Sequence, residues 1–152
     1  SAAEVASSKA VTKKAAATSP SSLTGSFAQN KGRMLFPVGG SYKIVRRFGR
    51  QPHPTLSHVW VDNSGIDIET GAGSSARAVF GGTVSAIFRQ DGHGSYVTVY
   101  AGLSSVAVSQ GQEVKAGQTI GTIARAAGRD VSELHFEVRN ERTKLNPTAW
   151  VR

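Results

Sequence analysis

The sequence predicts an all-β domain built from short antiparallel strands, and three observations support this fold class. Charged residues make up only 18% of the 152 residues, which argues against a long charged helix or a coiled coil. The chain contains 17 glycines, as expected where tight turns are frequent. Between the glycines lie short apolar runs at a spacing typical of a β-barrel or β-sandwich.

Nine short segments have the composition of strands, and glycines separate most of them. A brief helical turn is expected after Pro147. No internal repeat of solenoid length is present. The predicted strands are residues 43–48, 59–61, 66–68, 77–80, 83–88, 95–100, 113–115, 119–124 and 133–139.

The last of these strands can be assigned face by face, because side chains alternate along a strand. Leu134, Phe136 and Val138 are expected to point into the core. The other face then carries Glu133, His135, Glu137 and Arg139. Four ionisable groups in a row indicate either a solvated surface, which the spacing alone favours, or the floor of a groove.

The N-terminal segment differs in composition from the rest of the chain. Residues 1–22 are rich in Ala, Ser, Thr and Lys and contain no aromatic residue. We therefore expect a basic linker or regulatory segment with helical propensity over residues 1–22, and a folded domain over residues 23–152. One hypothesis is that this tail folds onto the groove or its rim and occludes it.

Composition excludes several classes of function. The chain lacks Cys, which excludes disulfides, thiol catalysis and Cys-based zinc fingers. It contains no apolar run near the 18 residues of a membrane span. The net charge of +8, half of it in the first 33 residues, indicates an anionic neighbour. We expect no nucleic acid, because neither a recognition helix nor an RNP-type aromatic pair is present.

Two residues stand out as candidates for chemistry. His135 is the histidine that lies among carboxylates, and histidine is both the commonest metal ligand and the usual base at neutral pH. Asp67 places a charge between Ile66 and Ile68 in an otherwise apolar strand. Asp67 could equally be a turn or cap acceptor.

Several motifs, which follow one another in the same order along the chain, resemble those of the lysostaphin-type (LytM) peptidoglycan endopeptidases. The resemblance covers about residues 30–152 and includes Leu-His-Phe-Glu-Val-Arg at 134–139 and Leu-Asn-Pro-x-x-Trp at 145–150. The other matching stretches are residues 48–50, 53–54, 65–68, 78–84, 96–104 and 114–121. The resemblance implies a duplicated hybrid motif of antiparallel strands, a sandwich or barrel with a groove.

The resemblance also implies where the active site would lie. Active members bind zinc through the first His of His-x-x-x-Asp, that Asp, and the second His of His-x-His. In this chain these positions are Asn63, Asp67 and His135. The two assisting histidines of the family correspond to Glu133 and Gly102.

We therefore interpret the domain as degenerate, with no catalytic residues and no zinc cofactor. An Asn amide is a poor zinc ligand, and Gly102 has no side chain that could transfer a proton. Asp67 and His135 would instead hydrogen-bond one another, with Asn63 or Glu133 completing the network. A weaker alternative is a repaired metal site formed by Asp67, Glu133 and His135.

Degenerate members of the family resemble murein hydrolase activators of the EnvC type. This resemblance implies a domain at the periplasm or extracytoplasmic cell envelope of a bacterium, acting in cell-wall organisation and cell division. It would bind and activate a cell-wall amidase, and activators of this type usually carry an upstream coiled coil. The expected partner-binding groove contains Asn63, Asp67, Glu133, His135 and Arg139.

Three alternatives remain open at this point. The first is a zinc-dependent peptidoglycan endopeptidase, and the second is a peptidoglycan-binding module without an enzyme partner. The third is a lipoyl- or biotinyl-type carrier, whose Gly-x-x-Val-x-x-Gly spacing occurs at residues 111–117. Lys115 has the wrong local context for an attachment site, so the third alternative indicates shared architecture only.

Overall fold

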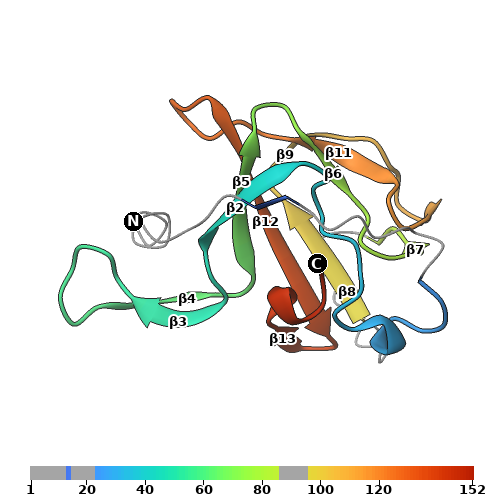
Figure 1. Ribbon diagram of the computed structural model, residues 1–152, viewed down its shortest axis with the longest axis horizontal. Helices are drawn as coiled ribbons and strands as arrows, with labels where there is room; N and C mark the ends of the chain where they lie inside the picture. The colour runs from blue at the N-terminus through green and yellow to red at the C-terminus, as the bar shows by residue number, and fades with distance from the viewer. Residues whose placement is uncertain (1–12, 15–22, 86–95) are drawn as a thin grey trace.

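The computed structural model describes residues 13–14, 23–85 and 96–152, and this part of the chain is all-β as predicted (Figure 1). The only helical segments in these ranges are two 3-10 turns, η2 (Ala28–Asn30) and η3 (Pro147–Ala149). The turn η3 follows Pro147 as expected, with Asn146 as its N-cap. Nowhere in the described ranges is there a helix with the length and hydropathy of a membrane span.

The strands are short, and most lie within one or two residues of the predicted segments. Their bounds are β1 (Lys13–Lys14), β2 (Ser41–Arg46), β3 (Gly49–Pro52), β4 (Trp60–Asn63), β5 (Ile66–Gly71), β6 (Ser75–Arg77), β7 (Gly82–Thr83), β8 (Tyr96–Ala101), β9 (Leu103–Val106), β10 (Glu113–Val114), β11 (Thr119–Ile123), β12 (Val131–Asn140) and β13 (Thr143–Leu145).

The central element is β12, a ten-residue strand that pairs antiparallel with three others. It pairs with β5 over residues 131–136, with β8 over residues 135–140 and with β13 over residues 138–140. On the far side of β5 lies β2, and the two-residue strand β1 extends the sheet beyond β2. The other strands form three smaller antiparallel sheets, β6–β11–β9, β7–β10 and the hairpin β3–β4.

The hydrophobic core lies against one face of this sheet. The predicted inward residues Leu134, Phe136 and Val138 are all fully buried, so the assignment of faces is confirmed. Ile66 and Ile68 of β5 lie opposite Phe136 and Leu134 in the sheet register and are equally buried. Residues 34–38 and the C-terminal residues Trp150 and Val151 also pack into the core. A β-bridge between Met34 and Val151 joins these two segments.

Besides β1 in the tail, three strands were not predicted, because each lacks a run of large apolar residues. They are β3, β9 and β13, whose sequences are Gly-Arg-Gln-Pro, Leu-Ser-Ser-Val and Thr-Lys-Leu. Conversely, the predicted strand 77–80 is shifted, since β6 occupies Ser75–Arg77. Parts of two predicted strands, residues 86–88 and residue 95, lie outside the described residues.

The tail was expected to have helical propensity, and its described part is a strand. Lys13 and Lys14 pair with Tyr42 and Ser41 at the edge of β2. Residues 1–12 and 15–22 lie outside the described part of the chain, so the expectation of a helix is not tested there. The division into segments 1–22 and 23–152 therefore stays a prediction.

Gly65 connects β4 to β5 at a point where two backbones approach closely. A Cβ atom at this position would lie 2.1 Å from the carbonyl oxygen of Phe136 and 2.7 Å from Cγ of Glu137. Because the first of these atoms belongs to the backbone of the central strand, no side-chain rotation can relieve the clash.

We therefore expect Gly65→Ala to lower the free energy of unfolding by about 1–3 kcal/mol, the range typical of overpacking. Chemical denaturation at neutral pH measures this change. Gly40→Ala is the matched control, since a Cβ at Gly40 meets nothing within 4 Å. Equal stability of the two variants would contradict the close approach at Gly65.

Candidate functional site

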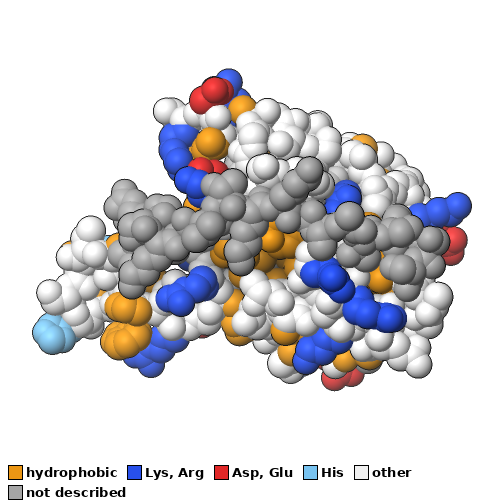
Figure 2. Space-filling model, in the orientation of Figure 1, with side chains coloured by type: hydrophobic (Ala, Val, Ile, Leu, Met, Phe, Trp, Pro, Cys, Tyr) orange, Lys and Arg blue, Asp and Glu red, His pale blue; other side chains and the backbone are white. Residues whose placement is uncertain are grey.

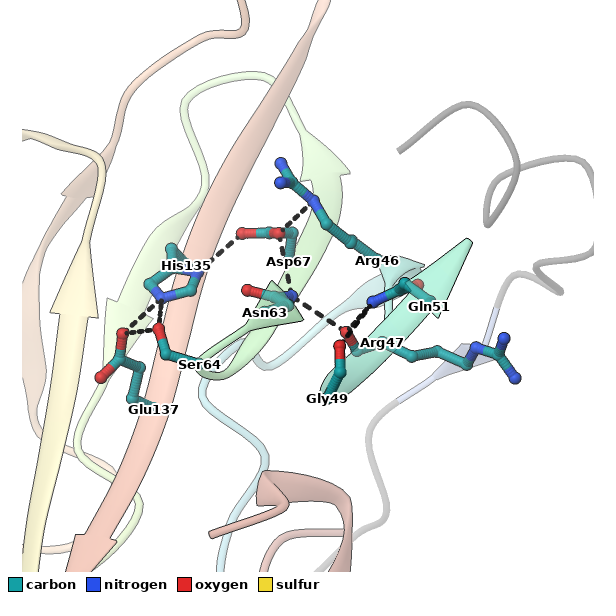
Figure 3. Close-up of polar contacts among 9 residues, drawn as sticks. All are labelled: Arg46, Arg47, Gly49, Gln51, Asn63, Ser64, Asp67, His135 and Glu137. Atoms are coloured by element: carbon teal, nitrogen blue, oxygen red, sulfur yellow. Dashed lines mark hydrogen bonds and ion pairs between the residues drawn. The ribbon is translucent and has the colours of Figure 1, made fainter. Parts of the chain in front are cut away.

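The site is a row of polar side chains on the face of the sheet opposite to the core. Asp67 on β5 lies directly across from His135 on β12, and Arg46 at the end of β2 lies next to Asp67 through a register shift. Directly opposite residues in antiparallel strands project from the same face, so the three side chains meet. Figure 3 shows them converging from three strands. We call this row the polar face, and it also includes Asn63, Ser64, Glu69, Arg129, Glu133, Glu137 and Arg139.

Asp67 is buried and uses both of its carboxylate oxygens. Oδ1 lies 2.8 Å from Nδ1 of His135, as expected from the sequence. Oδ2 accepts a hydrogen bond from the Asn63 amide at 3.3 Å, so Asn63 completes the network. Nε of Arg46 forms an ion pair with the same oxygen at 2.8 Å, without the alignment of a hydrogen bond.

His135 lies between two carboxylates. Its second ring nitrogen, Nε2, is 2.6 Å from Oε2 of Glu137. A carboxylate oxygen only accepts, so each ring nitrogen has to carry a proton to form its contact, and the ring is then an imidazolium. The hydrogen bond to Asp67 raises the pKa of His135, against the effect of burial, and the bond to Glu137 raises it further.

Glu137 is held by three donors and is nearly inaccessible to solvent. Besides His135, Ser64 Oγ donates to its Oε2 at 2.6 Å, and Arg139 Nε donates to its Oε1 at 2.6 Å. Burial alone would raise the pKa of Glu137, but the bonds from Ser64, His135 and Arg139 together lower it. The carboxylate is therefore ionised at neutral pH and bridges two cations.

Glu133 shares the face of the strand but none of these contacts. It lies across from Glu69, and burial raises the pKa of Glu133, with the nearby Asp67 raising it further and Arg46 opposing both. Glu69 forms an ion pair with Arg129 at 2.9 Å. In the described residues no group of three His, Cys, Asp or Glu side chains converges so that it could hold a metal ion.

Gly102 lies at the end of β8 in a backbone conformation that suits glycine. Its φ is +89°, and an added Cβ would lie 3.0 Å from the carbonyl oxygen of Glu133. Its own carbonyl accepts a hydrogen bond from the amide of Ala124 at 2.8 Å. A histidine at this position would therefore strain the backbone.

The charges of the polar face are layered by depth. The side chains of Asp67, Glu137 and Glu69 are 8%, 6% and 11% exposed, whereas those of Arg46, His135 and Arg129 are 36%, 26% and 57% exposed. These three carboxylates thus lie beneath the cations that contact them, whereas Glu133 on the same face is partly exposed. This overturns the simpler interpretation of a solvated strand face, because Glu137 is buried and His135 is half-buried.

Sequence reasoning missed two essential members of the site, Ser64 and Arg46. Ser64 Oγ is 3.5 Å from Nε2 of His135, and Nδ1 of His135 contacts Asp67. The three side chains are therefore connected in the same way as the serine, histidine and aspartate of a catalytic triad. Glu137 contacts Nε2 at 2.6 Å, which leaves His135 unable to accept a proton from Ser64. The only sequence signal for further site residues was the alternation of side chains along β12. It indicated Glu137 and Arg139 but neither Ser64 nor Arg46.

The buried core, the central antiparallel strand and a polar pair on its opposite face define a domain of the lysostaphin-like fold. Residues 61–147 match Peptidase family M23, and the chain belongs to that family of peptidoglycan hydrolases. A solved structure of the antimicrobial peptidase lysostaphin from Staphylococcus simulans shares the fold, with a TM-score of 0.51 and 24% identity over 70% of this chain and 48% of that one.

Two curated relatives differ in their named activities. The murein hydrolase activator EnvC of Escherichia coli is 29% identical over 86% of this chain and 32% of its own length. The DD-carboxypeptidase/endopeptidase Mpg of Neisseria meningitidis serogroup B is 31% identical over 78% of this chain and 31% of its own length. The chain thus spans about a third of the length of each relative.

The shifted pKa values of His135 and Glu137 predict how stability depends on pH in metal-free buffer. The raised pKa of His135 contributes stability that is complete below its unfolded value of about 6.5 and is lost as the pH rises through the folded pKa. The lowered pKa of Glu137 contributes stability above about 4.5 that is lost as the pH falls through its folded pKa. We expect the free energy of unfolding to be greatest between these values.

In His135→Gln the decline above pH 6.5 should become smaller than in the wild type. Chemical denaturation across the pH range measures it. His58→Asn is the control, since His58 is exposed and has a φ of +60° that Asn tolerates. Parallel curves for wild type and His135→Gln would contradict the imidazolium assignment.

Proposed function

We propose that this domain is a non-catalytic member of its family that binds and activates a cell-wall amidase through the polar face. The observation that carries the proposal is the saturation of Asp67 and His135 by other protein groups. Arg46 and Asn63 contact Asp67, and Glu137 contacts His135. The interaction residues we assign are Asn63, Asp67, Glu133, His135 and Arg139. We add the cations Arg46 and Arg129, which pair with Asp67 and Glu69.

The donor set suits a catalytic zinc poorly. Only Asp67 and His135 remain of the three ligands in the family pattern, and Asn63 offers an amide that donates its N–H to Asp67. Arg46 is a permanent cation 2.8 Å from the carboxylate that a zinc ion would need. The backbone at Gly102 does not suit a histidine either, so a proton carrier is missing as well.

The layering of charge supports a protein partner with an acidic segment. Cations that lie above buried carboxylates present donors to solvent, and charge-assisted hydrogen bonds to carboxylates are among the stronger contacts at interfaces. The similarity to the murein hydrolase activator EnvC makes an amidase the favoured partner. The location we propose is the periplasm or extracytoplasmic envelope of a bacterium, and an upstream coiled coil stays part of the proposal.

A zinc-dependent endopeptidase is the second candidate, and one observation favours it. The Glu137 carboxylate behind His135 is the arrangement that orients a metal-ligating histidine. The similarity to the endopeptidase Mpg is as strong as that to EnvC. A peptidoglycan-binding module without an enzyme partner is a third candidate, and the net charge of +8 suits an anionic polymer.

The metal content of the purified domain separates the first two candidates. After incubation with zinc and removal of the excess, we expect far less than one zinc per chain by mass spectrometry. Asn63→His should raise the zinc content, because an imidazole then joins Asp67 and His135 as a third ligand. About one zinc per wild-type chain would overturn the non-catalytic assignment and favour the endopeptidase.

Amidase stimulation tests the activator role directly. The domain should increase peptidoglycan release by a cognate amidase, and Arg46→Gln or Arg129→Gln should reduce this stimulation by about tenfold through loss of interface charge pairs. Arg142→Gln is the control, because Arg142 is exposed in the turn after β12. Circular dichroism verifies that each variant is folded. Full stimulation by the Arg46 and Arg129 variants would remove the polar face as the activating surface.

A further inference from the structure

The hairpin formed by β3 and β4 exposes an unusual amount of apolar surface. Among the described residues, four large hydrophobic side chains are exposed, and three of them, Leu56, Val59 and Trp60, belong to this hairpin at 55%, 40% and 54% exposure. Figure 1 shows the hairpin projecting from the body of the domain, and Figure 2 shows hydrophobic side chains gathered on it beside a basic one. Clustered exposed apolar residues commonly mark interaction surfaces.

The hairpin is held in shape by its own hydrogen bonds. Nδ1 of His53 accepts from the amides of Thr55 and Leu56 at 3.2 and 3.0 Å, and the His53 amide donates to the Val59 carbonyl at 2.7 Å. At the base, the Gln51 side chain donates to the carbonyl of Arg47 at 2.8 Å. A surface that is preorganised in this way loses less entropy on binding.

The exposed face of the hairpin combines an aromatic residue with a cation. Trp60 lies across from Pro52, and Arg50 lies across from Asp62, and all four are exposed. The guanidinium of Arg50 lies 5.0 Å from the centre of the Trp60 ring. Trp and Arg are the residues most enriched among the dominant contacts of protein interfaces.

The hairpin is continuous with the polar face. Asn63, the last residue of β4, donates to the Arg47 carbonyl at 3.0 Å and to Asp67, so one side chain joins the hairpin base to the site (Figure 3). The exposed Arg47 and Arg50 therefore extend the cationic surface that begins at Arg46. One bound segment could contact the polar face and the hairpin together.

We propose that the β3–β4 hairpin is a second contact surface for the same protein partner, and that it takes an acidic amphipathic segment of that partner with Trp60 as the anchor. This inference rests on the proposed function. Charge favours this occupant, because a second copy would bring the same arginines together. The continuity of the hairpin with the polar face favours a protein segment that spans both over an anionic membrane, which is left as an outcome of the test.

The test measures binding of the cognate amidase to the domain by biolayer interferometry, separately from amidase stimulation. We expect Trp60→Ala to weaken the affinity by about tenfold or more, as truncation of an interface anchor does. Arg50→Gln should weaken it less and reduce its dependence on salt. Val106→Ala is the matched control, since Val106 is 58% exposed on β9, outside the hairpin, and it should change the affinity less than about twofold.

Each outcome decides one question. Amidase binding by the wild type that is unchanged in Trp60→Ala overturns the hairpin proposal and leaves the polar face intact. Failure of the wild type to bind any amidase overturns the proposed function, and the hairpin proposal with it. A third outcome is that Trp60→Ala still binds the amidase but no longer pellets with peptidoglycan sacculi or phosphatidylglycerol vesicles. This outcome would overturn the proposal and assign the hairpin to those ligands instead.

Trp60 also offers a direct spectroscopic readout. The chain has two tryptophans, and Trp150 is buried in the core while Trp60 is half exposed. The emission difference between the wild type and Trp60→Phe therefore reports Trp60, and it should shift to the blue when a tryptophan-free peptide from the amidase covers the ring. A difference spectrum that is unchanged at saturating peptide would contradict the anchor role.

Discussion

The register of β12 against β5 is the constraint on which the rest of the molecule depends. It places Phe136 across from Ile66 on the core side and His135 across from Asp67 on the other side. Because side chains alternate along each strand, a slip of one residue would send His135 into the core and Phe136 into solvent. The apolar face thus fixes the polar one, and the contact between Asp67 and His135 is a consequence of packing that the site itself does not have to enforce.

Given that register, the polar face holds buried carboxylates whose charges have to be neutralised by nearby cations. Two buried carboxylates, Asp67 and Glu137, would be unfavourable alone. Asp67 is neutralised by Arg46 and His135 from the strands on either side, and Glu137 by His135 and Arg139 of its own strand. His135 links the two halves, because its two nitrogens point in opposite directions and each meets a carboxylate. Such a chain of charges contributes little net stability as a whole, yet losing one member leaves a buried charge uncompensated. The network therefore specifies an arrangement more than it strengthens the fold.

The extent to which the sequence predicts this structure follows from which signals are local. Alternation along 133–139 identifies both faces of β12, and the resemblance of motifs identifies Asn63 and Asp67 as neighbours of His135. The contribution of Arg46 could not be predicted, since it depends on a register shift between β2 and β5 that leaves no pattern in the sequence. Ser64 was missed for a similar reason, because its partner Glu137 is 73 residues away. Charge neutralisation across strands is a tertiary property, and composition carries no trace of it.

The positions at which this chain departs from the family pattern differ in how deeply they are built into the fold. Asn63 is buried and occupies its place through two hydrogen bonds of its side-chain amide. Gly102 is different, because its φ of +89° and the carbonyl of Glu133 beneath it exclude a side chain without backbone movement. A change confined to side chains could be reversed by a single substitution, whereas a change in the backbone requires neighbouring residues to shift together. The conformation at Gly102 is thus part of the architecture, whereas the contacts of Asn63 belong to one side chain.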